Sequence, residues 1–462
     1  MRAVLAFVFA SLSFVGGPVL AADYYVAPIG ATLNGTPDGS QAQPFPSIAA
    51  AFGSKKITGG DTVFLMDGPH GEVNIYGQAF TSPVVITSVN SKKAQLENIL
   101  FGNGTRNITL RALQIVPTNP NVQSRHLVRS YADTSDITVE LSWLRGSTDA
   151  FNFRKWDAAT WQARKFDAIF LQGPRSKVLR NRIAAVNMGI VVDGADALVE
   201  LNVINGFNAD GLRGNGRNNV FRYNRVYNCV QTDGNHADGF QSFAIANGKV
   251  GSGSVDGLVL DGNVFIEWTD GTMHPLRCAL QGIGMFNGFY DNVTITNNLV
   301  ATRAYHGIAV YGARGGVISN NTVVNVVNKA ERWPWIILAN HQSGTKSSDV
   351  VVANNVAMAY MGVSDPANRV SFANNSVIGT PGNVFLNADT LDYRPKASSG
   401  FIDAADPAFS TANDLMRQTR TAGGAPDLGA YETQTTAVAA ENLPGGGKWI
   451  RIPTAFISPT GP

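Results

Sequence analysis

Residues 231–241 (QTDGNHADGFQ) hold the densest group of side chains in this sequence that could transfer protons. The stretch contains Asp233, His236, Asp238 and Gln241. Histidine titrates near neutral pH, so a histidine gathered with carboxylates can act as a general base. The pattern predicts His236 as the base, with Asp238 and the upstream Arg213 as further catalytic residues. Alternatively, DGN and ADG are turns in which Asp caps backbone amides and His236 is simply exposed.

These side chains must be positioned by a repeat that runs through much of the chain. Each copy has an apolar residue, two positions, an Asn, one position and another apolar residue. The repeated residues are Asn181, Asn202, Asn224, Asn263, Asn298, Asn321, Asn355 and Asn375. Plain units are about 22 residues long, which is a typical solenoid period. Asn suits a coil corner because it tolerates the left-handed conformation and can hydrogen-bond from coil to coil.

A second strand-like segment recurs inside each unit, as in DGLRGNG, DGFQSFA, QGIGMFN and HGIAVYG. Two short strands per unit, with no long amphipathic helix between them, predict an all-β parallel solenoid. Stacked in register, the first positions of these segments form one column, with neighbouring coils about 4.8 Å apart. This column reads Asp167, Met188, Asp210, Asp238, Gln281 and His306.

Alternation along the second strand predicts which side chains face outward. The third positions are all apolar and therefore buried, so the second, fourth and sixth positions should point outward. This places Arg213, Gln241 and Asn215 on the outer face, and it sets Phe243 beside Phe286 in the sixth column. Insertions flank the second strand in the middle coils. We expect them to form a groove whose floor is this strand.

Two further groups of residues are candidates for binding. Asp210 and Asp238 fall on adjacent coils, where they would raise each other's pKa, bind Ca²⁺ or pair with Arg213. Ca²⁺ is therefore a candidate cofactor, although the sequence requires none. The candidate substrate-binding residues are Gln241, Asn215, Trp268, His274, Arg277, Arg303, His306, Tyr311 and Trp333. Aromatic rings can stack on sugars and arginines can pair with acidic ones; for each Trp the alternative is ordinary packing within a loop.

Composition and the chain ends restrict the class of protein. The 462 residues include 36 Lys and Arg against 34 Asp and Glu, so no basic excess indicates nucleic acid as a partner. Residues 1–21 have a basic start, an apolar run and a small-residue cleavage site, which predicts a signal peptide and a secreted or periplasmic protein. No other apolar run is long enough to span a membrane. Cys229 and Cys278 precede the second strand in consecutive units, so we expect a disulfide between them.

Motifs near both ends of the chain also indicate its fold family. The chain begins its mature part with YYVAPIGATLNGTPDGSQAQPF and GDTVFLMDG, and it reaches APDLGAYE at 425–432. With the Asn repeat, these motifs resemble the right-handed parallel β-helix superfamily of pectate-lyase-like proteins, including alginate-lyase and chondroitin-lyase relatives. The resemblance implies a single-stranded right-handed parallel β-helix. We expect a cap and first strands over 22–65 with a capping helix within 45–54, the β-helix over 66–432, and a linker and tail over 433–462.

Three functions remain open at this point. The resemblance favours a monomeric polysaccharide lyase that cleaves an acidic, uronate-containing polysaccharide by β-elimination. In this hypothesis His236 removes the proton, and Arg213, or Ca²⁺ on Asp210 and Asp238, stabilises the developing negative charge. The second hypothesis is a glycoside hydrolase that uses two carboxylates. FNADG and NHADG are similar to the NTDG motif of polygalacturonases. The third is a non-catalytic carbohydrate-binding β-helix.

Overall fold

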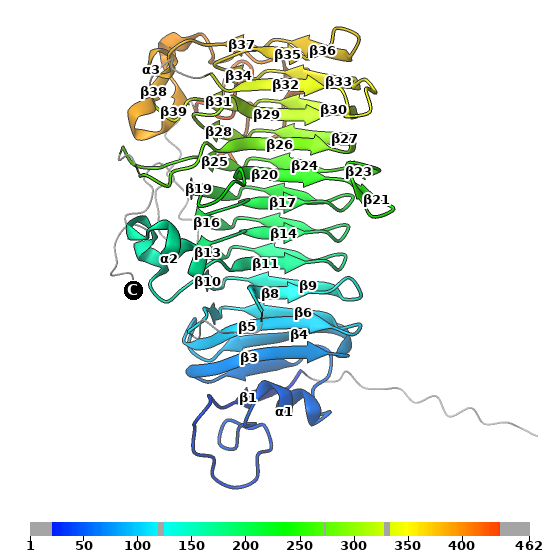
Figure 1. The fold of residues 1–462 in the computed structure, drawn as a ribbon, viewed down its shortest axis with the longest axis vertical. Coiled ribbons are helices and arrows are strands. Elements are labelled where there is room, and N and C mark those ends of the chain that lie inside the picture. The colour runs from blue at the N-terminus through cyan, green and yellow to red at the C-terminus, as the bar shows by residue number, and fades with distance from the viewer. Residues whose placement is uncertain (1–20, 119–123, 272–273, 328–332, 435–462) are drawn as a thin grey trace, which may run out of the picture.

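The structure is a computed structural model that describes residues 21–118, 124–271, 274–327 and 333–434. Its strands wind into a parallel β-helix (Figure 1). A 14-stranded sheet forms one ladder, and a 21-stranded sheet contains two more ladders that share β5. All but the last residue of the predicted signal peptide (1–21) and most of the predicted tail (433–462) lie outside the described residues. No helix within the described ranges is long and apolar enough to cross a membrane.

The first ladder is the 14-stranded sheet. It contains β1 (Asp23–Val26), β2 (Thr62–Leu65), β4 (Ala79–Ser88), β6 (Arg106–Arg111), β9 (Ser135–Glu140), β12 (Lys177–Leu179), β15 (Leu198–Glu200), β18 (Val220–Arg222), β23 (Ser254–Asp256), β24 (Val259–Asp261), β27 (Phe289–Thr296), β30 (Ala313–Ser319), β33 (Ser348–Ala353) and β36 (Arg369–Ala373). Every pairing in it is parallel, so each coil adds one rung.

The second and third ladders form the 21-stranded sheet. The second contains β5 (Ala94–Gly102), β7 (Gln114–Ile115), β10 (Trp143–Arg145), β13 (Arg182–Val186), β16 (Val203–Phe207), β19 (Arg225–Cys229), β25 (Val264–Ile266), β28 (Leu299–Ala301), β31 (Thr322–Val324), β34 (Val356–Ala357) and β37 (Ser376–Val377). The third contains β3 (Gly68–Tyr76), β5, β8 (His126–Ser130), β11 (Asp167–Leu171), β14 (Ile190–Val192), β17 (Leu212–Gly214), β20 (Asp238–Phe243), β26 (Gln281–Asn287), β29 (His306–Tyr311), β32 (Trp335–Ala339) and β35 (Met361–Val363). The third ladder holds the recurring second segments of the sequence.

Short elements decorate this solenoid. The helices are α1 (Ile48–Gly53), α2 (Ala158–Ala163) and α3 (Pro381–Val384), with 3₁₀ turns η1 (Ala150–Lys155), η2 (Ala388–Thr390), η3 (Ala397–Ser399) and η4 (Pro407–Phe409). Two antiparallel pairs are β21 (Ile245–Ala246) with β22 (Lys249–Val250) and β38 (Phe385–Asn387) with β39 (Asp392–Pro395). The side chain of Ser47 caps α1, whose apolar side chains join the main core near β1 and β3 (Figure 1).

Each complete coil has three short strands, where the sequence predicted two. The repeated motif bends in its middle, because Asn181 lies between β12 and β13. Its first apolar residue therefore belongs to the first ladder and its last to the second. The period and the corner were predicted from the sequence, but the bend hides a strand boundary inside what looks like one strand.

The eight repeated Asn residues form one continuous ladder, as predicted. The Oδ1 of each Asn after Asn181 accepts hydrogen bonds from the backbone N–H and the side-chain amide of the Asn one coil before it, as between Asn202 and Asn181 at 2.9 and 3.0 Å. The same pattern continues through Asn224, Asn263, Asn298, Asn321, Asn355 and Asn375. The conformational reason was wrong, however. The left-handed residue is the one before each Asn, such as Arg180 and Leu201.

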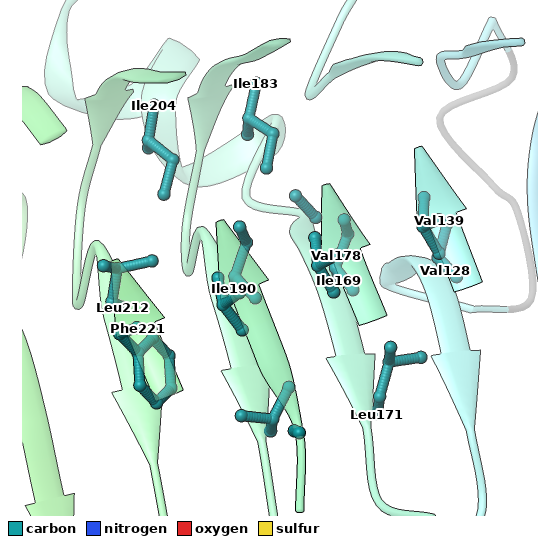
Figure 2. Close-up of a cluster of buried hydrophobic side chains, with 14 of the residues drawn as sticks. Val128, Val139, Ile169, Leu171, Val178, Ile183, Ile190, Ile204, Leu212 and Phe221 are labelled. Carbon is teal, nitrogen blue, oxygen red and sulfur yellow. The ribbon is translucent and has the colours of Figure 1, made fainter. Parts of the chain in front are cut away.

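A continuous apolar core fills the interior (Figure 2). Ile169, Ile190 and Leu212 from the third ladder are fully buried and pack among side chains such as Val178 and Ile183 from the other two ladders. Burying a side chain of this size stabilises the fold by about 1.5–3 kcal/mol. This apolar column fixes the register of the third ladder, so it also fixes which residues of adjacent coils become neighbours.

The second positions of the third-ladder segments do not point outward, contrary to prediction. They are mostly glycine, and an added Cβ at Gly211 would lie 2.2 Å from Val226 Cγ1, while one at Gly282 would lie 2.3 Å from Val300 Cγ1 and Gly307 O. These glycines therefore face the core and the neighbouring coil. The side chains at position one turn to the outer face instead.

Candidate functional site

Asp210 and Asp238 lie on adjacent coils of the third ladder, two residues before the first residue of β17 and at the start of β20. The pairing of Arg213 with Gln241 sets their register. The backbone N–H of Asp238 donates to Asp210 Oδ1 at 3.3 Å, and the two residues are 1% and 0% exposed. The two carboxyl groups therefore stack on each other beneath the outer surface.

Each carboxylate is held by side chains of its own coil. Arg213, three residues after Asp210, forms an ion pair with Asp210 Oδ2. The Oδ2 of Asp238 accepts from Gln241 Nε2 at 3.1 Å and lies 3.2 Å from His236 Nδ1. The structure thus brings together five of the residues predicted from the sequence: two carboxylates, an arginine, a histidine and a glutamine.

A glycine on the next coil makes room for Asp238. The register pairs Gln241 with Gly284, and a Cβ at Gly284 would lie only 2.4 Å from Asp238 Oδ1. This Oδ1 atom is buried and has no hydrogen-bond partner among the described residues. A buried acceptor without a partner destabilises the fold. A bound water or a ligand would satisfy this atom.

Burial and mutual repulsion shift the pKa values of this cluster. Removal from water, with the Asp210 charge next to it, raises the pKa of Asp238 to about 7. Burial also raises the pKa of Asp210, although the Arg213 charge opposes this. The hydrogen bond to Asp238 raises the pKa of His236. The hydrogen bond joins the two groups, so they titrate as a pair, and the exposed imidazole is the member placed to act as a general base.

His236 is the part of the cluster that reaches solvent. Its side chain is 55% exposed, whereas that of Arg213 is 18% exposed. Because Nδ1 faces Asp238, the Nε2 atom is left to interact with a ligand. The arrangement supplies a base at the surface, a carboxylate that orients it and a guanidinium one coil away.

The loop that carries His236 is anchored at its base. Cys229 and Cys278 form a disulfide with their Cα atoms 5.6 Å apart. Next to it, Gln231 N donates to Leu276 O at 2.8 Å. Farther along, Lys165 Nζ, just after α2, lies 2.5 Å from Asp233 Oδ2. These links join residues 229–233 to two insertions.

Asp210 and Asp238 do not fit a calcium site. Calcium takes six to eight oxygen ligands, but Asp210 is occupied by a guanidinium, and Asp238 by an imidazole and an amide donor. No group of three or more His, Cys, Asp or Glu side chains within the described ranges could hold a metal ion. Of the roles predicted for Asp210, the ion pair with Arg213 agrees with the structure better than a calcium ligand does.

The insertion after β25 packs inward rather than facing a ligand. Trp268 is 2% exposed in a cluster with Phe153 and Trp161, so the prediction that it binds a sugar is wrong. Both ring nitrogens of His274 are used within the protein, one on Arg154 O at 2.8 Å and one by Leu276 N at 3.1 Å. These residues fix the insertion.

Arg277 and Arg303 also have structural partners. Both donate through Nε to the buried carboxylate of Glu267, at 2.7 and 2.6 Å, and the Arg277 side chain is only 4% exposed. Removing either arginine would leave a buried charge less compensated. The prediction that they bind an acidic sugar is therefore wrong for Arg277, whose side chain is buried. For Arg303, whose side chain is 28% exposed, it stays a prediction.

The side chain of Asn215 forms hydrogen bonds to the two neighbouring coils. Its Nδ2 donates to Asp193 Oδ1 at 2.9 Å, and its Oδ1 accepts from Phe243 N at 3.0 Å. The predicted sixth column is also shifted beyond this point, because an irregularity pairs Phe243 with Asn287 and not with Phe286. Asn215 thus links three coils and is not available as predicted.

An aromatic group lies two and three coils from Asp238. His306 has ring contacts with Phe286, Tyr305 and Trp335, with centroids 5.1, 4.3 and 5.5 Å away, and Tyr311 contacts Phe286. His306 and Tyr311 were predicted as binding residues, whereas Tyr305 was missed because it precedes the strand. Trp333 is 50% exposed nearby in sequence.

Comparisons with known proteins find likenesses among solved structures only. No protein-family model matches this sequence, and no curated protein matches it significantly. Similar solved structures include a PL6 alginate lyase in complex with a trisaccharide (14% identity, TM-score 0.48, covering 86% of this chain and 95% of that one). They also include pectate lyase Pel9A (16%, 0.44, 90% and 97%) and the A-module of the Azotobacter vinelandii mannuronan C-5 epimerase AlgE6 (15%, 0.45, 71% and 93%). Identities and TM-scores this low carry no information about the reaction.

Proposed function

We propose that this chain is a secreted polysaccharide lyase that cleaves a uronate-containing polysaccharide by β-elimination. One observation carries the proposal: an exposed histidine oriented by a buried carboxylate lies one coil from an arginine on the same outer face. The pair is suited to removing a proton, and the guanidinium is suited to binding the carboxyl group beside it.

The reaction can be assigned to named atoms. His236 Nε2 takes the proton from C5 of the uronate while Asp238 holds Nδ1. The electron pair shifts toward the uronate carboxyl group, where Arg213 stabilises the added negative charge. The bond from C4 to the glycosidic oxygen then breaks and a C4–C5 double bond forms. The leaving oxygen takes up a proton from water, and His236 releases the C5 proton to solvent, which restores the base.

Burial argues against the glycoside hydrolase hypothesis. A hydrolase of this type needs one carboxyl group that reaches the sugar and another that reaches it or activates a water. Asp210 and Asp238 are 1% and 0% exposed, and Asp210 is neutralised by Arg213. Asp210 therefore serves to position Arg213, and Asp238 serves to orient His236.

A panel of acidic polysaccharides tests the proposal. We expect at least one of alginate, polygalacturonate, chondroitin and hyaluronan to yield products with the ultraviolet absorbance of an unsaturated uronate. His236→Ala should lower turnover by at least about a hundredfold while the melting temperature stays nearly unchanged, because this side chain is largely exposed. New reducing ends without ultraviolet absorbance would indicate hydrolysis and refute the proposal.

A further inference from the structure

Four consecutive residues of one column carry buried polar atoms without partners. Asp238 pairs with Gln281, the register of Ile283 with Ile308 sets Gln281 beside His306, and His306 pairs with Trp335. Asp238 Oδ1, Gln281 Oε1, His306 Nδ1 and Trp335 Nε1 all lack hydrogen-bond partners among the described residues. Each such atom destabilises the free protein by roughly 1–3 kcal/mol. A row of them indicates a polar ligand that supplies the missing partners.

The far end of this row is aromatic. Tyr305 is 53% exposed, and its ring lies 4.3 Å from that of His306 and 4.9 Å from that of Trp335. An exposed side chain changes rotamer rapidly. Tyr305 can therefore rotate aside to admit a ligand to the two rings beneath it, and its ring can then pack against the ligand's face.

This end of the row differs in charge from the catalytic cluster. Burial, together with the nearby His236 charge, lowers the pKa of His306 to about 4. His306 is thus neutral at physiological pH, and Gln281, Tyr305 and Trp335 carry no charge. The row combines an amide acceptor, a neutral imidazole and an indole donor. Hydroxyl groups, which both donate and accept, match this combination better than a carboxylate does.

We propose that Gln281, Tyr305, His306 and Trp335 form a sugar-binding subsite that holds a pyranose ring of an oligosaccharide several units from the catalytic cluster. This subsite deepens the proposed function and rests on it for the class of substrate. With coils about 4.8 Å apart, Trp335 lies three coils, or roughly 14 Å, from Asp238. A single sugar cannot reach both places, so the saccharide runs along the helix axis from Asp238 toward β32.

Direct binding tests the subsite without requiring turnover. Calorimetry on the full chain carrying His236→Ala, which slows cleavage at least about a hundredfold, would use disaccharides and hexasaccharides of mannuronate, guluronate, galacturonate and glucuronate as probes. We expect one hexasaccharide to bind at least about tenfold more tightly than its disaccharide, equivalent to about 1.4 kcal/mol. Adding Tyr305→Ala should remove this gain and leave disaccharide binding unchanged. Trp335→Phe keeps a ring but removes the N–H donor, so it should remove part of the gain.

The matched control is Phe372→Ala, which removes a 42% exposed ring from β36 on the first ladder. It should leave both affinities unchanged. The proposal is overturned if no hexasaccharide binds, if Tyr305→Ala retains the full gain, or if it weakens disaccharide binding equally. Length-dependent binding by the His236→Ala chain, with no unsaturated product from the wild-type chain, would support the subsite and refute the lyase. Cleavage by the wild-type chain, with no effect of Tyr305→Ala on hexasaccharide binding, would support the lyase and refute the subsite.

Discussion

Asp238→Asn should stabilise the protein at alkaline pH while it abolishes most activity. The wild-type carboxyl group is fully buried, and its pKa rises from an ordinary 3.8 to about 7. The folded state therefore binds a proton more tightly than the unfolded state, so stability falls as pH rises from about 4 to about 7. Asparagine has nearly the same shape and keeps an oxygen acceptor for Gln241, but it carries no charge.

The size of the effect follows from the shift. Each pKa unit corresponds to about 1.36 kcal/mol, so the rise from 3.8 to about 7 makes the loss on the order of 4 kcal/mol. The raised pKa of His236 acts in the same direction, since its stabilising contribution is present below pH 6.5 and disappears as pH rises through its folded value. Asp238→Asn removes both terms at once.

Urea unfolding from pH 5 to pH 8 measures this directly. We expect the free energy of unfolding of the wild type to fall over this range and that of Asp238→Asn to change much less, so that the variant is the more stable protein at pH 8. Its turnover of the susceptible polysaccharide should fall at least about a hundredfold, since His236 loses the carboxylate that orients it. Lower stability than wild type at pH 8 would refute the buried-charge argument.

Asp233→Asn is the matched control in the same loop. This carboxylate is exposed, and the Lys165 side chain lowers its pKa, which is the opposite of Asp238. An exposed ion pair contributes at most about 1 kcal/mol. The control should therefore lose slight stability at neutral pH and keep its turnover. A loss of turnover comparable to that of Asp238→Asn would mean that loop position, rather than the carboxylate beside His236, decides activity.

Two further variants separate chemistry from scaffold. Arg213→Ala should lower turnover by about 10²–10³-fold, the usual effect of removing a group that stabilises transition-state charge. Arg213→Lys should restore only part of this turnover. Full activity in Arg213→Ala would exclude Arg213 from the catalytic mechanism. Asn263→Ala removes the partner of Asn224 N and of Phe221 O inside the coil, so we expect about 3–5 kcal/mol less stability in urea unfolding, and a loss below 1 kcal/mol would contradict the role of the Asn ladder.

Sequence reasoning worked where the solenoid imposes its period. The apolar third positions and the repeated Asn residues each occupy one place in every coil, so a pattern in the sequence becomes a line in space. This places Arg213 beside Gln241 and Asp210 beside Asp238 without any other structural information. Correct register alone was enough to assemble the charged cluster.

In the insertions between the repeated units, residue type did not predict which side chains face a ligand. Trp268, Arg277 and Arg303 belong to insertions whose packing depends on partners distant in sequence, such as Trp161. A tryptophan or arginine in a loop is equally compatible with a ligand and with a buried partner. Here a second small core and the carboxylate of Glu267 account for them. Tyr305 was missed for the opposite reason, because it is exposed but precedes the strand used to define the columns.

The glycines at the second position of most third-ladder segments explain why Asp210 and Asp238 lie where they do. Gly211 and Gly239 come directly after Asp210 and Asp238, and an added Cβ at either would strike a core side chain. Neither glycine has positive φ among the described backbone angles, so close packing rather than turn geometry excludes other residues. Since position two faces inward with no side chain, position one is free to turn outward and stack from coil to coil. The Asp-Gly pairs that suggest turns in the sequence are therefore the means by which the fold aligns its carboxylates under His236.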